Sequence, residues 1–303
     1  MTVTLDPRPA GQRQASARRG AAAPRGGRRG GATLPALLLL LGAVYCLLPV
    51  AWVLIASTKS GAELFTTFTL VPGGSLPRNV ADLSAYRDGL YWRWMANTAL
   101  YAGVGALLSA GLSGLTGFTL AKYRFRGRTA VFNVLLAGVL VPGITLAIPQ
   151  YLLLAEVGIT DTYWSVLLCS IVSPYGIYLA RIYAGAAVPD ELIEAARTDG
   201  ARELRIFRSV ALPVMLPGLV TIFLFQFVAI WNNFLLPYIM LSDDRKFPMT
   251  VGLYTLLNRG ASIPALYTLV TAGALLSILP LVALFLTLQK YWKVNLLTGA
   301  VKA

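Results

Sequence analysis

The stretch that decides the interpretation of this chain is ELIEAARTDGARELRIFRSVALPVMLP, residues 191–217. It is the one long segment that mixes both signs of charge between two very apolar segments. Pro189 and Asp190 predict a helix start, because proline is tolerated in the first turn and an acid there complements the helix dipole. Gly200 predicts the end of that helix, since glycine readily adopts the left-handed conformation of a helix terminus. A second helical piece should follow and lead, near Pro213, into an apolar span.

The composition of the whole chain is that of an integral membrane protein. Of its 303 residues, 56% are hydrophobic and only 13% are charged, and the mean hydropathy is +0.66. Soluble domains carry about 25% charged residues. The net charge of +13 lies in short basic runs beside apolar segments, which is how membrane proteins set their orientation, so we expect no nucleic-acid partner. The chain has no histidine, which excludes imidazole metal sites and Ser-His-Asp triads.

Six apolar runs predict an all-α, polytopic fold with six transmembrane helices in a lipid bilayer. The first run, 33–57, follows a basic tail at 1–32 that is too poor in apolar residues to bury a core and is expected to be disordered. The other runs are Met95–Ala121, Thr129–Leu154, Tyr163–Ala184, Val210–Leu241 and Pro264–Gln289. The fifth is longer than a bilayer requires, so we expect it to be tilted, or broken near Pro213, Pro217 or Pro237.

The distribution of basic residues predicts the orientation of these spans. With a cytoplasmic N-terminus, the cytoplasmic segments hold 19 of the 26 Lys and Arg residues and the outside segments hold the other 7. The positive-inside rule favours this arrangement. Both termini, the C-terminal tail at 290–303 and the segment around Gly200 are therefore expected in the cytoplasm, and residues 58–94 outside.

The outside segment 58–94 shows no firm secondary-structure pattern. It ends in Tyr91-Trp92-Arg93-Trp94, just before the second apolar run. Aromatic residues at this place are typical of an interfacial belt. A surface that touches an external partner is the alternative interpretation.

The spans show no energy source of their own. None of the six runs has an acidic or basic residue near its centre, which counts against a proton-coupled carrier, although a sodium site of carbonyls and hydroxyls would escape this test. No phosphate-binding G-x-x-x-x-G-K-[ST] loop is present either. We therefore expect that the chain is not an enzyme and binds no cofactor itself, and that any energy for moving a solute uphill arrives through a partner.

Small residues around the turn at Gly200 suit a docking element, because they let another backbone approach closely. Ala195, Ala196 and Ala201 flank the turn. A solvated amphipathic loop is the simpler reading of the same pattern.

These residues carry a family resemblance. Glu194-Ala195-Ala196, followed by Asp199-Gly200-Ala201 and then by Phe207 and Leu212-Pro213, resembles the EAA motif of ABC importer membrane subunits. Three further stretches resemble the smaller permease subunit of maltose-type carbohydrate importers. They are Ile148-Pro149-Gln150-Tyr151-Leu152 with Asp161-Thr162-Tyr163-Trp164, then Trp231-Asn232-Asn233-Phe234-Leu235, and the ending Leu297-Thr298-Gly299-Ala300-Val301-Lys302.

The resemblance, which runs from about Leu34 to the C-terminus, implies a type I ABC importer fold, a transmembrane core at 95–289 and an EAA coupling loop at 190–213. In that family the loop sits in a cleft of a cytoplasmic ATPase dimer, which hydrolyses the ATP. A second permease subunit and an extracytoplasmic solute-binding protein complete the assembly, and the C-terminal tail 293–303 resembles tails that also contact the ATPase. The residues implied to dock or to tie the loop to the fifth span are Glu194, Ala195, Ala196, Asp199, Gly200, Ala201, Phe207, Leu212 and Pro213.

Sugars are recognised by amide and hydroxyl hydrogen bonds and by aromatic faces. The candidates for the translocation path are Gln150, Tyr151, Tyr175, Gln226, Trp231, Asn232 and Asn233. Polar groups in lipid must find partners, so each of them is equally suited to hydrogen bonds between helices. Asn233 stands where family members often have an acidic residue, which leaves its role by analogy open.

The resemblance predicts a permease subunit of an ATP-driven importer for a sugar or oligosaccharide. A different cargo, such as glycerol-3-phosphate or a polyol, is an alternative, although the spans offer no basic residue for a phosphate. A self-sufficient carrier or channel is a second alternative, and a membrane scaffold without a solute path is a third.

Overall fold

The computed structural model describes residues 33–291, with Thr33 known through its backbone alone. Every regular element in this part of the chain is helical, which confirms the all-α prediction. The predictions for the N-terminal tail, for the ending at 297–302 and for most of the C-terminal tail lie outside the described residues. The chain divides into two units, up to Pro49 and from Val50 onward.

The first unit contributes most of one helix to the described residues. Helix α1, Thr33–Ser57, has the bounds of the first apolar run and continues into the second unit, with Pro49 inside it. Its side chains from Leu34 to Pro49 are all exposed. An exposed surface of leucine and valine suits a helix whose surroundings are lipid rather than water.

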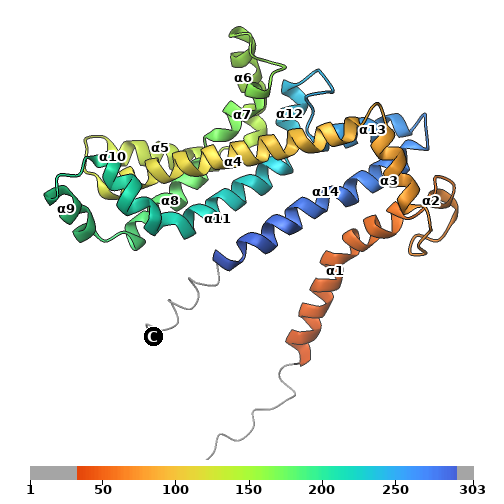
Figure 1. Ribbon diagram of the computed structural model, residues 1–303, viewed down its shortest axis with the longest axis horizontal. Coiled ribbons are helices and arrows are strands. Elements are labelled where there is room, and N and C mark those ends of the chain that lie inside the picture. The colour runs from red at the N-terminus through yellow and green to blue at the C-terminus, as the bar shows by residue number, and fades with distance from the viewer. Residues whose placement is uncertain (1–32, 292–303) are drawn as a thin grey trace, which may run out of the picture. The chain divides into compact units, whose positions relative to one another are not determined.

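The second unit holds the remaining helices, which Figure 1 labels. Their bounds are α2 Glu63–Thr66, α3 Leu76–Ala85, α4 Leu90–Lys122, α5 Arg128–Leu140, α6 Gly143–Glu156, α7 Tyr163–Ile171, α8 Pro174–Ala187, α9 Asp190–Thr198, α10 Glu203–Ile206, the π-helical turn η2 Phe207–Ala211, α11 Leu212–Trp231, α12 Leu235–Met240, α13 Met249–Gly260 and α14 Leu266–Leu288.

Five helical stretches in the described residues are long and apolar enough to cross a bilayer. They run over Leu34–Ser57, Leu90–Lys122, Tyr163–Ala187, Glu203–Trp231 and Leu266–Leu288. The third run, 129–154, is not the continuous helix that we expected, because α5 and α6 meet at an angle of 106°. Pro142, in extended conformation before α6, explains the break: its ring disfavours helical geometry for the residue before it. The described chain thus has five spans, or six if this bent pair is one span.

The fifth apolar run is also broken, shortly before Pro237, one of the three prolines near which we expected a break. Residues 203–231 form one helical stretch, and Pro213 and Pro217 lie inside it. The helix ends at Trp231, and a short helix, α12, begins only at Leu235. Asparagine favours such a break, because its side chain competes for main-chain hydrogen bonds. Asn232 shows this competition directly, since its side-chain nitrogen donates to the carbonyl of Val228 at 2.8 Å.

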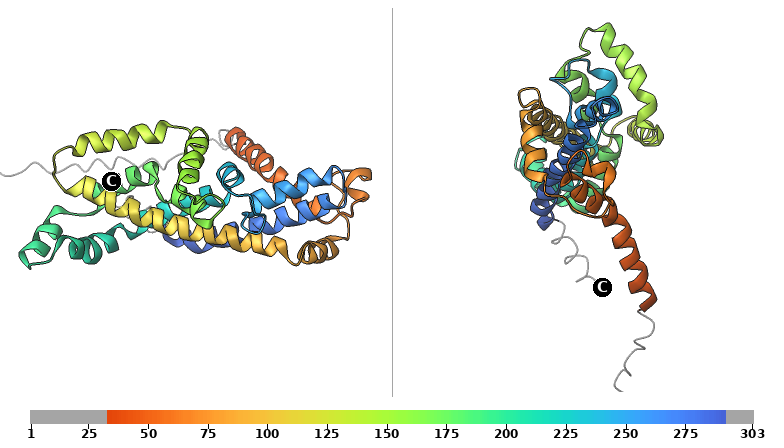
Figure 2. Two further views of the ribbon diagram at one scale, coloured as in Figure 1. Left: turned by 90° about the horizontal axis from the view of Figure 1, so that it is seen from above. Right: turned by 90° about the vertical axis from the view of Figure 1, so that its right-hand side faces the viewer.

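The centre of the second unit is the packing of α4 against α8 and α11, which run side by side in Figures 1 and 2. The buried face of α4 is made mostly of small residues. They include Ala102, Gly105, Ala106, Ser109, Ala110, Ser113, Gly114 and Gly117. Small residues at such spacing let helix backbones approach closely in a membrane, where packing rather than the hydrophobic effect drives association.

At its other end, α4 uses larger side chains to hold the loop that follows α12. Trp94 donates from its indole nitrogen to the carbonyl of Asp244 at 2.8 Å, and Asn97 donates to the carbonyls of Arg245 and Phe247 at 2.9 and 3.0 Å. These bonds satisfy main-chain groups of a segment without regular structure, which would otherwise be costly to bury.

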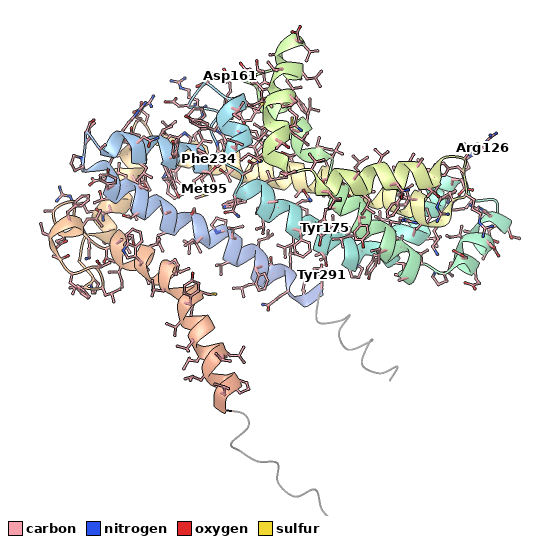
Figure 3. The ribbon with its side chains drawn as sticks, turned by 180° about the vertical axis from the view of Figure 1, so that it is seen from behind. Met95, Arg126, Asp161, Tyr175, Phe234 and Tyr291 are labelled. Carbon is pink, nitrogen blue, oxygen red and sulfur yellow. The ribbon has the colours of Figure 1, made fainter. Side chains whose placement is uncertain are left out.

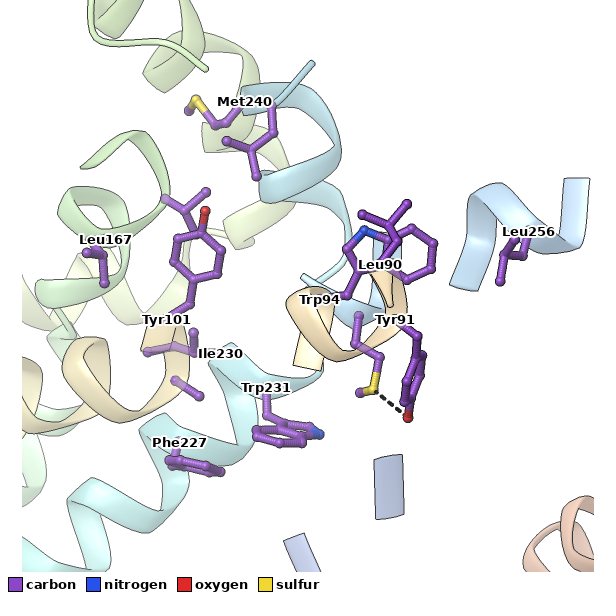
Figure 4. Close-up of a cluster of buried hydrophobic side chains, with 14 of the residues drawn as sticks. Leu90, Tyr91, Trp94, Tyr101, Leu167, Phe227, Ile230, Trp231, Met240 and Leu256 are labelled. Atoms are coloured by element: carbon purple, nitrogen blue, oxygen red, sulfur yellow. Dashed lines mark hydrogen bonds between the residues drawn. The ribbon is translucent and has the colours of Figure 1, made fainter. Parts of the chain in front are cut away.

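The aromatic motif Tyr91–Trp94, in the first turns of α4, is therefore mainly core rather than the belt or contact surface that we expected. Tyr91 and Trp94 are fully buried among the side chains shown in Figure 4, whereas Trp92 remains 46% exposed. Tyr91 donates from its hydroxyl to the carbonyl of Gly273 in α14 at 2.9 Å. The helices α3 and α13, for which the sequence offered no firm pattern, pack against α14 and frame this region.

A substitution at Gly117 tests how far the fold depends on close packing. A methyl group there would lie 2.6 Å from the main-chain nitrogen of Arg181, so α8 would have to move. We expect Gly117→Ala to destabilise the protein by about 1–3 kcal/mol, the usual cost of overpacking. Thermal unfolding of the detergent-solubilised protein measures this.

Gly111→Ala is the matched control, because nothing lies within 4 Å of the added atom on the same helix. That variant should be neutral or slightly stabilising, as alanine favours helix over glycine by about 1 kcal/mol. Equal melting temperatures for the two variants would contradict the packing argument.

Candidate functional site

The 190–213 segment forms a helix, a tight turn and a second helix that continues into α11. Helix α9 ends with Gly200 at a φ of +75°, the conformation that its position required. The N–H of Gly200 donates to Arg197, and the N–H of Ala201 donates to Ala196, at 2.9 and 3.0 Å. These two bonds are the Schellman motif that closes a helix C-terminus. The turn is thus well ordered, unlike a loose solvated loop.

The residues expected to dock fall into two groups by exposure. Glu194, Ala195, Asp199 and Gly200 are exposed, together with Pro213 at the start of α11. The others are partly buried and pack against a core cluster of their own chain: Ala196, Ala201, Phe207 and Leu212. The first group can meet a partner, whereas the second attaches the segment to the helices behind it.

Two apolar side chains beside the exposed group were not among the expected docking residues. Leu192 is 46% exposed and Leu204 is 71% exposed. One lies on α9 and the other on α10, so they bracket the turn. Apolar side chains that gather into one exposed patch are a feature of surfaces that bind another protein.

Polar contacts tie this segment to the end of α4. Lys122 donates to Asp190 at 2.7 Å, which holds the first residue of α9. Tyr123, directly after α4, donates its hydroxyl to Glu203, the first residue of α10. Arg197 also binds Glu203, with 3.0 Å between Nε and Oε1. The salt bridge and hydrogen bond from Lys122 hold the pKa of the Asp190 carboxyl below its ordinary value.

The second half of the segment is a rigid extension of α11. The ring of Phe207 packs against the ring of Phe118 in α4, with 5.5 Å between the two centroids. The π-helical turn at 207–211 ends two residues before Pro213, and it lies where the proline leaves a main-chain carbonyl without an α-helical partner. Helical structure therefore runs without a gap from Glu203 to Trp231.

At the far end of α11, two adjoining hollows of about 290 and 590 Å³ lie between α5, α6, α7, α8, α11 and α12. They share Gly138, Cys169, Val172, Pro174, Ala229, Asn233 and Leu236. The larger is within the range of small-molecule sites. None of the described residues that line them is acidic or basic, so the hollows suit an uncharged solute.

Five of the seven expected path residues line these hollows: Gln150, Tyr175, Gln226, Asn232 and Asn233. Gln226 donates to the hydroxyl of Ser173 at 2.6 Å, so part of its role is to join α11 to α8. Asn233 lines both hollows, and its side-chain nitrogen has no hydrogen-bond acceptor among the described residues. Figure 3 labels Tyr175 and also Phe234, the residue that follows Asn233 in the sequence.

The other two expected path residues lie elsewhere. Trp231 is 2% exposed and stacks on Phe227 with 5.4 Å between ring centroids, as Figure 4 shows, so it is a core residue. Tyr151 is partly exposed and lines neither hollow. Periodicity cannot distinguish such positions, because in a membrane both the core and the lipid-facing side are apolar.

An aromatic group beside the larger hollow was missed. Phe234 lines the hollow and lies 5.2 Å from Tyr238 and 4.8 Å from Tyr254, between ring centroids. Both tyrosines are more than a third exposed. The i, i+4 spacing of Phe234 and Tyr238 was the available signal; Tyr254 lies on α13, which the sequence did not predict.

A polar cluster around Asp161 joins the loop before α7 to the loop after α12. Asp161, whose φ is +54°, accepts from the N–H groups of Ser242 and Asp243 at 3.0 and 3.1 Å and from Lys246 at 3.0 Å. Burial raises the pKa of Asp161, but these donors lower it by more, so its pKa lies below the ordinary value. No group of three or more metal-binding side chains occurs among the described residues.

Comparisons with known proteins give the family. Residues 113–293 match the family model described as binding-protein-dependent transport system inner membrane component. The chain is 36% identical to the arabinooligosaccharides transport system permease protein AraQ of Halalkalibacterium halodurans, over 71% of this chain and 75% of that protein. It is 32% identical to the lactose transport system permease protein LacG of Rhizobium radiobacter, over 88% of this chain and 94% of that protein.

A solved structure agrees in fold. A chain of a bacterial ABC transporter involved in the import of the acidic polysaccharide alginate superposes with a TM-score of 0.75. It is 26% identical, and the match covers 87% of this chain and 96% of that chain. These matches confirm the resemblance to ABC importer permeases. The chain belongs to the family of inner-membrane components of binding-protein-dependent transport systems.

Proposed function

We propose that this chain is the permease subunit of an ATP-driven importer for an uncharged sugar or oligosaccharide. The observation that carries the proposal is the pair of adjoining hollows at the end of α11, whose described lining is uncharged and includes side-chain amides and an aromatic group. Amide hydrogen bonds and aromatic faces are what a sugar requires. The named cargoes of the two relatives, arabinooligosaccharides and lactose, support the same class.

The alternative cargoes fit less well. Glycerol-3-phosphate would need a cation at its phosphate, and the described lining of the hollows holds none. A polyol would lack the ring faces that stack on aromatic side chains. A self-sufficient carrier is disfavoured because the relatives are subunits of transport systems.

The assembly would include a second permease, a cytoplasmic ATPase dimer and an extracytoplasmic solute-binding protein. The family description itself supports dependence on a binding protein. Both termini and the 190–213 segment would face the cytoplasm, as the distribution of basic residues indicates. The chain would hold no ATP, so every ATP-driven movement would reach it through the ATPase.

In the proposed mechanism, the exposed face of the 190–213 segment binds the ATPase. Closure of the ATPase dimer then moves α9 and α10. Because α10 continues into α11 without a gap, this movement would reach the hollow directly. The contacts of Lys122 and Tyr123 would transmit it to α4 as well, so two core helices move together rather than one.

Ala195 offers a test of docking that should not disturb the fold, because its side chain is exposed. We expect Ala195→Trp to prevent the ATPase from co-purifying and to abolish ATP-driven uptake, since the indole would fill the space that a close backbone approach needs. Ala81→Trp, equally an exposed alanine but on α3, is the control and should keep the ATPase. Normal uptake in the Ala195 variant would exclude docking at this face.

The contacts of Lys122 and Tyr123 with the 190–213 segment predict a different defect, in coupling rather than in binding of the ATPase. Tyr123→Phe combined with Asp190→Asn removes one hydrogen bond and one ion pair while it keeps side-chain shape. We expect the ATPase to remain bound but the ATP hydrolysed per solute imported to rise, because movement of α9 and α10 would no longer be passed to α4 through these two contacts.

The control for this double variant is Asp82→Asn, which removes the exposed Arg78–Asp82 pair at 3.8 Å elsewhere in the chain. It should leave the ratio of ATP to solute unchanged. An unchanged ratio in the double variant would show that α4 takes no part in coupling.

Asn233 tests the solute path. We expect Asn233→Leu to raise the KM for uptake about tenfold, as the loss of one hydrogen bond of about 1.4 kcal/mol would do. Asn133→Leu on α5, exposed and outside both hollows, should leave the KM unchanged. If both variants transport with the wild-type KM, the hollow is not the path.

A further inference from the structure

A hollow of about 370 Å³, separate from the proposed solute path, is bordered by three arginines. Arg124 comes from the turn after α4, Arg128 is the first residue of α5, and Arg181 lies on α8. They are separated in the sequence by up to 57 positions, and folding brings them to one place. We call this group the arginine site.

Two of the three guanidinium groups are held in position. Arg181 lies over the ring of Phe132, with 3.5 Å from its central carbon to the ring centroid. Phe132 in turn stacks on Tyr178 at 6.3 Å. Arg128 donates one hydrogen bond to the carbonyl of Tyr123, at 3.2 Å. Stacking of this kind orients a guanidinium and leaves its N–H edge free to donate.

None of these arginines forms a direct salt bridge. Within residues 33–291, no carboxylate oxygen lies within 4.0 Å of Arg124, Arg128 or Arg181. The charge of Arg124 acts on Asp190 from a longer distance, and Asp190 itself is paired with Lys122 at 2.7 Å. Three like charges around one hollow repel each other, and an anion would relieve that repulsion.

The N-terminus of α5 adds to the positive potential at the arginine site. Gly127, with a φ of +86°, precedes the helix, and no side chain caps the free N–H groups of its first turn. The partial positive charge of a helix N-terminus favours an anion such as phosphate. This contribution strengthens a site that already rests on the three arginines.

The surroundings indicate what kind of anion fits. Helix α5 has no buried residue, and its apolar side chains are strongly exposed from its start near the arginines to its far end. Val131 at 45% and Val134 at 71% lie in the first two turns, Leu140 at 81% ends the helix, and Phe125 at the rim of the hollow is 43% exposed. A free phosphate would use none of this surface, whereas the acyl chains of a lipid would cover it.

We propose that the arginine site binds the phosphate headgroup of an anionic phospholipid, whose acyl chains lie along the exposed apolar surface of α5. The geometry matches the fork of arginine, which binds phosphate oxygens with two parallel hydrogen bonds. Basic pockets between membrane helices on the cytoplasmic side are suited to such headgroups. The site adjoins the contacts of Lys122 and Tyr123, so a bound lipid would steady the end of α4.

Basic residues at a membrane surface also set topology, and that role requires charge alone. It explains neither the stacking of Arg181 on Phe132 nor the convergence of three segments. Arg126 makes the distinction testable: it carries the same charge in the same turn but does not line the hollow. Figure 3 labels it at this end of the molecule.

The test uses the full-length chain in its assembled, detergent-solubilised transporter. Phosphatidylglycerol, phosphatidylcholine and inorganic phosphate are titrated separately, and the melting temperature is followed, because a ligand that binds the folded state raises it. For wild type we expect stabilisation by phosphatidylglycerol alone. Arg128→Gln and Arg181→Gln should each raise the concentration for half-maximal stabilisation about tenfold, which corresponds to about 1.4 kcal/mol.

Arg126→Gln is the control and should respond to phosphatidylglycerol as wild type does. Each variant is compared with its own lipid-free melting temperature, so a general loss of stability does not imitate a loss of binding. Equal stabilisation by phosphatidylcholine would overturn the proposal, as would stabilisation by inorganic phosphate alone. An Arg126→Gln effect as large as that of Arg181→Gln would reduce the site to nonspecific surface charge.

Discussion

The structure depends on the close approach of α4 to α8 and α11. Inside a bilayer, apolar surface gains little by leaving lipid, so helices must associate through packing and hydrogen bonds. Gly117 meets the backbone of α8, and Gly114 meets Leu219 of α11. Every feature of functional interest lies at one end or the other of these three helices, so their packing keeps the two ends in a fixed relation.

This fixed spacing between the two ends explains how the proposed coupling would work. The helical stretch 203–231 is about 43 Å long at 1.5 Å per residue, with the exposed turn before one end and the uncharged hollows at the other. A rigid helix transmits displacement, whereas a flexible loop would absorb it. Lys122, Tyr123 and Phe118 fasten the turn to α4, so a load applied at the turn would be shared between two helices.

The sequence was informative where local chemistry decides the structure. Pro189 and Gly200 bound α9 as expected, and the apolar runs located the long helices. It failed where neighbours decide. Trp94 and Trp231 are buried because other helices surround them, which hydropathy cannot reveal when lipid and core are both apolar. The break at Asn232 lies shortly before Pro237, one of the expected places, whereas Pro213 and Pro217 are accommodated within the helical stretch.

The central claim is that this chain moves solute only when a separate ATPase drives it. The direct measurement is uptake of radiolabelled oligosaccharide into vesicles that contain this chain, its partner permease, the ATPase and the binding protein, with and without ATP. Vesicles with this chain alone are measured in parallel. The account predicts uptake that requires ATP and the complete assembly. Uptake by the chain alone, without ATP, would contradict it.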